Sequence, residues 1–275
     1  MRSARRTCLA LLGLVLLGAP ALASAEEIPM PSVRVKAAAV PIPGFPGTGN
    51  FYGKGADVEA TLEITGSGYG ATAQNPNGSP PPISEVNVYL PKGVKLHPSG
   101  FASCSEATLK NIGPSGCPRK SIASAIGSAL GEVTFGSERV PEETSLRAFF
   151  APGGGFLFYT QGSTPVSLEV ISTGRYVRSS GKYSWELKTL VPPVPTVTGA
   201  PLATVSRIHL KAGAALRSHG KVIPYGTVPK KGECPRGGFY GKTEITFGGM
   251  FGGAREFGIP AKTVTDVIRV PCPRR

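Results

Sequence analysis

The sequence predicts an all-β fold, a large β-sandwich, from three observations. Short segments in which apolar and polar residues alternate recur between residues 33 and 270. The chain of 275 residues contains 37 glycines and 27 prolines, which is typical of many turns and unsuited to a helical protein. Four cysteines lie beyond residue 100, and an even number is typical of a disulfide-stabilised exported chain. A jelly-roll-like arrangement is one form that such a sandwich takes.

The first 25 residues predict a secretory signal peptide. Arg2, Arg5 and Arg6 precede an apolar run that ends in the small residues Ala23-Ser24-Ala25. This run is too short to span a bilayer stably, and no second run of about 20 apolar residues follows it. We therefore expect residues 26–275 to be exported without a transmembrane segment, either secreted or associated with the cell wall. Arg5-Arg6 leaves the twin-arginine route open beside general secretion.

Ten segments carry the strand pattern. In the segment DVEATLEI (57–64), apolar residues occupy every second position, as expected of a strand with one buried face. The other nine segments are 33–40, 85–90, 145–150, 156–160, 166–172, 183–190, 204–210, 243–247 and 263–270.

Turn residues predict how some of these strands connect. Ala-Pro-Gly-Gly-Gly separates 145–150 from 156–160, and RSSGK (178–182) precedes 183–190, so both connections are candidate hairpins. The segments 66–82 and 191–201 are rich in glycine and proline and predict long surface connections. We expect one domain over 26–275, and two sublobes divided near 191–201 remain the alternative.

One short helix is predicted among these strands. The segment SEATLKNIG (105–113) has Ser105 in the N-cap position, Glu106 in the first turn and Gly113 at the end. The following segment SIASAIGSAL (121–130) fits either a helix or a strand, because its large apolar residues are four positions apart.

The cysteines predict two local disulfides. Of the three possible pairings, Cys104 with Cys117 and Cys234 with Cys272 is favoured because each pair brackets a short unit. Loops of these lengths imply about 3 and 4 kcal/mol of stabilisation. Zinc would require a tighter cluster such as Cys-x-x-Cys, and none is present. We expect neither a metal nor a cofactor.

Two stretches carry a resemblance. The first runs from Leu90-Pro91-x-Gly93 through Cys104 to Gly-Pro-x-x-Cys117-Pro-x-x-Ser-x-Ile. The second joins Cys234-Pro-x-Gly-Gly-Phe to Val-Pro-Cys272-Pro. This combination resembles a module of uncharacterised exported bacterial proteins. The resemblance implies secretion and a disulfide-stapled β fold without an established chemistry. It also supports the two pairings and favours a strand in the segment that begins at residue 121.

The net charge indicates which partners suit the chain. Removing residues 1–25 removes three arginines and no acidic residue, so 27 basic and 17 acidic residues leave a charge of +10. A positive surface outside the cell attracts anionic wall polymers or acidic polysaccharides. The alternative is that the charge only aids solubility. We expect no nucleic-acid partner, because the chain has no repeated basic and aromatic motif and is exported. The sequence leaves the oligomeric state open.

The candidate catalytic residues are Asp57, Glu59 and Glu63, which share the polar face of the segment 57–64. Alternate residues of a strand rise about 6.6 Å, a spacing that suits the paired carboxylates of glycoside hydrolysis. The order and spacing nevertheless differ from those of jelly-roll glucanases, and the chain has only one tryptophan to line a cleft. We therefore expect a non-catalytic structural or binding protein. An extracellular polysaccharide-active enzyme remains the alternative.

Overall fold

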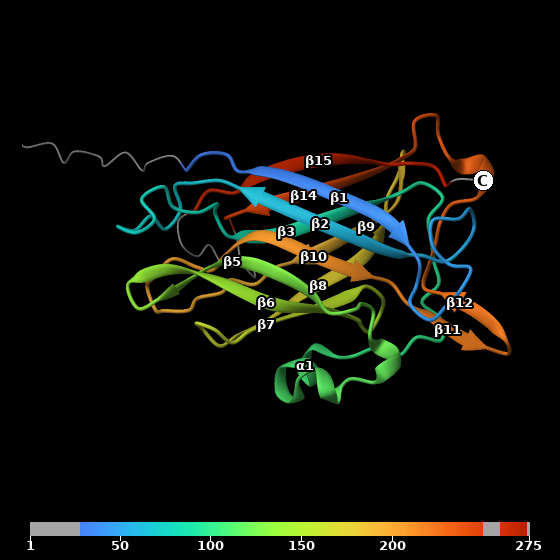
Figure 1. Ribbon diagram of the computed structural model, residues 1–275, viewed down its shortest axis with the longest axis horizontal. Helices are drawn as coiled ribbons and strands as arrows, with labels where there is room; N and C mark the ends of the chain where they lie inside the picture. The colour runs from blue at the N-terminus through green and yellow to red at the C-terminus, as the bar shows by residue number, and fades with distance from the viewer. Residues whose placement is uncertain (1–27, 250–258, 274–275) are drawn as a thin grey trace, which may run out of the picture.

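The computed structural model describes residues 28–249 and 259–273 and confirms the all-β prediction. Its main feature is an antiparallel sheet of 11 strands (Figure 1). In spatial order the strands are β1 (Ser32–Val40), β2 (Asp57–Thr65), β10 (Thr204–Ala212), β5 (Gly127–Phe135), β6 (Glu138–Phe150), β7 (Phe156–Gly162), β8 (Leu168–Arg178), β9 (Tyr183–Leu190), β3 (Ile83–Pro91), β14 (Phe239–Phe247) and β15 (Lys262–Val270). The predicted signal peptide lies outside the described residues, as does most of the turn at 248–253.

Smaller elements complete the fold. Two short pairs join β4 (Lys95–Leu96) to β13 (Gly226–Thr227) and β11 (Ala215–Ser218) to β12 (Lys221–Pro224). The helical elements are α1 (Glu106–Ile112) and three short 3-10 turns, η1 (Pro114–Gly116), η2 (Arg119–Ser121) and η3 (Lys231–Glu233).

The large sheet curls until it is nearly barrel-shaped, so that its two halves face each other as the layers of a sandwich do. All its neighbouring strands are antiparallel, so successive strands in the sheet run in opposite directions. With 11 strands, the two outermost strands β1 and β15 must therefore run in the same direction. They lie side by side (Figure 1), and the Val35 N–H donates a hydrogen bond of 2.7 Å to the Asp266 carboxylate across the seam.

Alternation sorts the side chains of each strand between the inside and the outside of the sheet. At the β6–β7 hairpin, Ala148, Phe150 and Phe156 pack on the inside. Their neighbours Phe149 and Leu157 point outward and pack against α1. This explains the consecutive aromatic residues of the segment 145–150, because both faces of the hairpin are covered.

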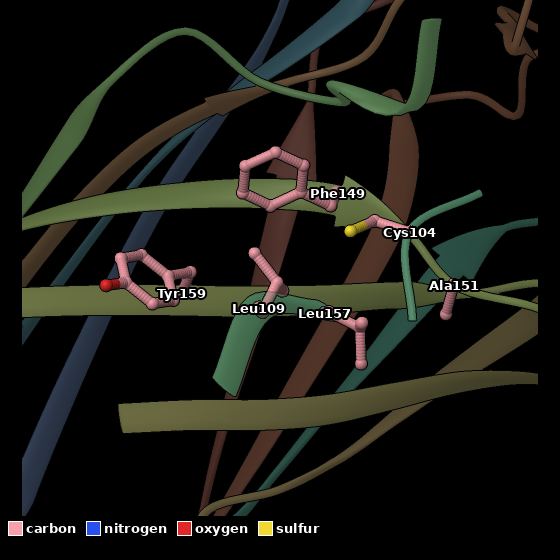
Figure 2. Packing of buried hydrophobic residues seen from close by; sticks show 6 residues of the cluster. All are labelled: Cys104, Leu109, Phe149, Ala151, Leu157 and Tyr159. Atoms are coloured by element: carbon pink, nitrogen blue, oxygen red, sulfur yellow. The ribbon is translucent and has the colours of Figure 1, made fainter. Parts of the chain in front are cut away.

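The predicted helix and its disulfide are confirmed. The Ser105 side chain accepts a hydrogen bond from the Thr108 N–H, and the Gly113 N–H donates to the Leu109 carbonyl oxygen. The Leu109 side chain is fully buried against the outer face of β6 and β7, and Figure 2 shows the six buried residues that meet there. The bridge between Cys104 and Cys117 closes this unit and holds it against the sheet.

The predicted disulfide and hairpin at the carboxyl-terminal end are also confirmed. Cys234 and Cys272 form the second disulfide, next to the pair Phe239 and Val270 at which the β14–β15 hairpin begins. The two other predicted hairpins are β6–β7 and β8–β9. The ambiguous segment at 121–130 makes isolated bridges at Ile122 and Ser124 and enters strand β5 at Gly127. Strands on both sides of 191–201 belong to the same sheet, since β9 pairs with β3 and β10 pairs with β2.

The seam contact yields a first prediction. Replacing Asp266 with Ala removes the acceptor of the Val35 N–H, which has no ladder partner on that side, and should lower the free energy of unfolding by about 1–3 kcal/mol. The measurement is chemical denaturation of the mature protein. Thr265→Ala is the matched control, because Thr265 is exposed on the outer face of the same strand. Equal effects of both variants would show that the contact does not hold the seam.

Candidate ligand-binding site

A cavity of about 460 Å³ lies inside the curled sheet. Its volume is within the range of small-molecule sites, about 300–1,000 Å³. The lining comes from strands all around the sheet and is mostly aliphatic, with Val35, Ala60, Val170 and Ile268 as representatives. The two halves of the sheet therefore enclose space between them rather than packing together completely.

Small side chains explain why this space exists. Ala37 on β1 is directly opposite Ala60 on β2, and both line the cavity. Ala60 is in turn opposite Leu210 on β10. Alanine side chains reach only a short distance into the interior, whereas an 11-stranded sheet encloses more width than an eight-stranded one, whose side chains can just fill its interior.

Burial differs along the interior. Ile245 and Phe247 are fully buried, in a cluster with Leu62, Ile64 and Ile83. A second cluster includes Phe150, Phe156, Leu187 and Tyr225. Members of both clusters line the cavity, whereas the inward residues of β1 and β15 are only half-buried. These half-buried apolar side chains are the surface that an apolar ligand would cover.

Two carboxylates, those of Glu132 and Glu142, border the cavity, and Glu142 is the more deeply buried of the two. Glu142 is 2% exposed, and its Oε2 accepts a hydrogen bond of 3.2 Å from the Val166 N–H. Its Oε1 has no hydrogen-bond partner among the described residues. This oxygen lies directly over Gly162, where an added Cβ would be 2.3 Å away, so the position requires glycine. Sequence analysis missed Glu142 because the segment 138–144 has no clear alternation.

The three predicted carboxylates lie elsewhere. The inward residues of β2 are Val58, Ala60 and Leu62, which line the cavity. Glu59 is on the opposite, outer face, where its carboxylate is 3.5 Å from Lys211 Nζ and 3.7 Å from His209 Nε2.

Glu63 follows on the same outer face, opposite Arg34 on β1 and Arg207 on β10. The cavity lining includes neither Glu63 nor Glu59 nor Asp57.

Asp57 differs from the other two because it is buried, with 3% of its surface exposed. Its Oδ1 has no hydrogen-bond partner among the described residues and packs against Gly213. Burial raises the pKa of the Asp57 carboxyl from 3.8 to about 6, and the positive charge of Lys211 opposes part of this effect. The position of Asp57 at the start of β2 gave no sign of this burial.

Between residues 28 and 249 and between 259 and 273, no group of three or more His, Cys, Asp or Glu side chains is arranged to hold a metal ion. No helix within these ranges is long and apolar enough to cross a membrane.

Comparison with known proteins gives no relative. No protein-family model, no curated protein and no solved structure matches this chain.

The burial of Asp57 yields a second prediction. Its pKa is higher in the folded protein than in the unfolded chain, so the wild-type protein should lose stability as the pH rises from about 4 to above 6. Asp57→Asn cannot ionise and should increase the free energy of unfolding near pH 7.5 by about 1–2 kcal/mol, allowing for screening by water. Near pH 4 the free energy of unfolding of the variant should be close to that of the wild type, because the wild-type carboxyl is then mostly protonated.

The measurement is chemical denaturation at both pH values. Glu59→Gln is the control, because the Glu59 carboxylate is half-exposed and ion-paired, so this variant should not be more stable than the wild type at pH 7.5. An Asp57→Asn variant that is less stable than wild type at pH 7.5 would contradict the prediction.

Proposed function

We propose that this chain is a secreted or cell-surface-associated, non-catalytic binding protein that holds an apolar ligand inside its sheet. The observation that carries the proposal is the cavity of about 460 Å³ bordered by half-buried aliphatic side chains. Each methylene group that moves from water into such a space contributes about 0.8 kcal/mol. An alkyl chain of suitable length would therefore bind without any specific polar contact.

The location is part of the proposal. Two disulfides and the absence of a membrane-crossing helix in the described residues are compatible with an extracellular protein. The predicted signal peptide would direct the chain to export from the cell. The positive charge of the mature chain would keep it near anionic wall polymers or polysaccharides, which are its proposed surface partners.

The alternative, a polysaccharide-active enzyme, has less support. It needs Asp57, Glu59 and Glu63 on the floor of an open groove. These residues are absent from the lining of the cavity, and the Glu59 carboxylate contacts Lys211 and His209 on the outer face. Asp57 is buried beside Gly213, where a sugar ring has no access. The geometry therefore favours binding inside the sheet.

The third prediction tests the cavity with neutral ligands. Isothermal titration of the mature protein with n-alkanols from hexanol to dodecanol should give saturable binding, with affinity increasing about fourfold per methylene until the cavity is full. Absence of saturable binding across the series would contradict the proposal. Hydrolysis of a glycan in parallel assays, lost in Glu59→Gln, would support the enzyme instead.

Filling the cavity should block this binding. Ala60→Phe places a ring in the space opposite Ala37, and Ala37→Leu is a smaller change at the same level. We expect each to weaken dodecanol binding, with the larger loss for Ala60→Phe. Thr265→Phe adds the same ring on the outer face and should leave the affinity unchanged. Thermal unfolding of each variant shows that it is folded.

A further inference from the structure

The described loops at the two ends of the curled sheet differ in charge. Because strand directions alternate, every loop emerges at one end or the other. The segments 66–82, 163–167 and 191–203 emerge at one end and contain no Lys, Arg, Asp or Glu. This end is to the left in Figure 1. A ligand with a charged group finds no partner in these three segments.

Lysines gather at the opposite end. Its loops include 41–56, 92–94, 179–182 and 213–238. We use the name basic rim for five exposed lysines of these loops and of β4: Lys54, Lys92, Lys95, Lys182 and Lys230.

Backbone contacts hold the members of the basic rim near one another. The Lys92 N–H donates a hydrogen bond of 3.0 Å to the Lys182 carbonyl oxygen. The Val228 N–H donates one of 2.9 Å to the Lys54 carbonyl oxygen. Lys95 is paired with Thr227 in the small β4–β13 sheet. The rim is therefore built on connected backbone segments.

The basic rim adjoins the cavity. Pro91, Val94 and Pro229 line the cavity, and each directly precedes a rim lysine in the sequence. Val228 lines it too and contacts the backbone of Lys54. The apolar lining therefore continues up to the loops that carry the lysines, with no intervening acidic residue in the chain between them.

Among the described residues no rim lysine is ion-paired, and the one carboxylate beside the rim, that of Glu233, lies against Gly93. The one acidic residue of the four loops is Glu233, whose Oε2 accepts a hydrogen bond of 2.8 Å from the Lys230 backbone N–H. Lys182 Nζ lies 5.2 Å from the centre of the Tyr240 ring. Like charges repel one another, and a bound anion would relieve the repulsion.

We propose that the ligand is a single-chain anionic amphiphile. Its alkyl chain lies in the cavity, and its carboxylate or phosphate head group is bound by the basic rim. This inference rests on the proposed function, because it needs an occupied cavity. An anionic polymer alone would not explain why the lysines adjoin the apolar lining. A neutral apolar ligand would not explain why the described loops at the two ends of the sheet differ in charge.

The fourth prediction compares ligands that differ only in the head group. Dodecanoate should bind about tenfold more tightly than dodecanol at low salt, because charge-assisted hydrogen bonds to lysine are added to the same chain burial. Raising the salt concentration from about 50 to about 200 mM should reduce this preference without weakening the binding of dodecanol. Dodecyl phosphate in the same titration shows which of the two head groups the rim prefers.

Charge-neutralising variants locate the head group. The double variants Lys92→Gln/Lys95→Gln and Lys54→Gln/Lys230→Gln should lose most of the preference for dodecanoate and keep the wild-type affinity for dodecanol. Lys36→Gln/Lys110→Gln removes the same charge from exposed positions on β1 and α1 and should change neither affinity.

The outcomes separate this inference from the proposed function. If neither dodecanol nor dodecanoate binds, the cavity is not a ligand site and both proposals fail. If both bind equally, the cavity site stands and the anionic inference is wrong. If dodecanoate is preferred equally in wild type and in the rim variants, the head group lies elsewhere and the inference is also wrong.

Discussion

The constraint on which the structure depends is the pairing of 11 strands, each antiparallel to its neighbours, in one curled sheet. An odd number places the outermost strands β1 and β15 in the same direction, so the antiparallel ladder cannot continue across the seam. The Asp266 carboxylate and the Val35 N–H make a contact there instead. The same strand number gives the sheet a width that alanine and valine side chains do not fill, and the cavity is the result.

Strand direction also determines which loops, and therefore which charged side chains, lie at each end of the sheet. Each loop lies at the end of the sheet that is set by the direction of the strands it joins. The proline-rich, uncharged segments 66–82 and 191–203 therefore lie at one end, and the lysine-bearing loops lie at the other. The disulfide between Cys234 and Cys272 lies at the lysine end, where it ties the start of β14 to the chain that follows β15. The helix unit closed by Cys104 and Cys117 instead covers the outer face of β6 and β7 and does not enter the interior.

Local features of this fold could be predicted because local physics determines them. Ser105 and Gly113 mark the helix ends through their own backbone groups, and each cysteine pair brackets a short unit. The order of the strands could not be predicted, because β10 enters between β2 and β5 through contacts distant in the sequence. The cavity was missed for a related reason. Alternation in 57–64 shows which residues share a face, but not that alanines from neighbouring strands face the same empty space.

The most direct measurement of the central claim is nuclear Overhauser contact between a bound alkyl chain and the methyl groups of the mature protein. The account predicts contacts from the ligand methylenes to the inward methyl groups of Ala37, Ala60 and Val170, which line the cavity. Contacts confined to the outward methyl groups of Val177 and Val267, which are exposed on the outer face, would contradict it.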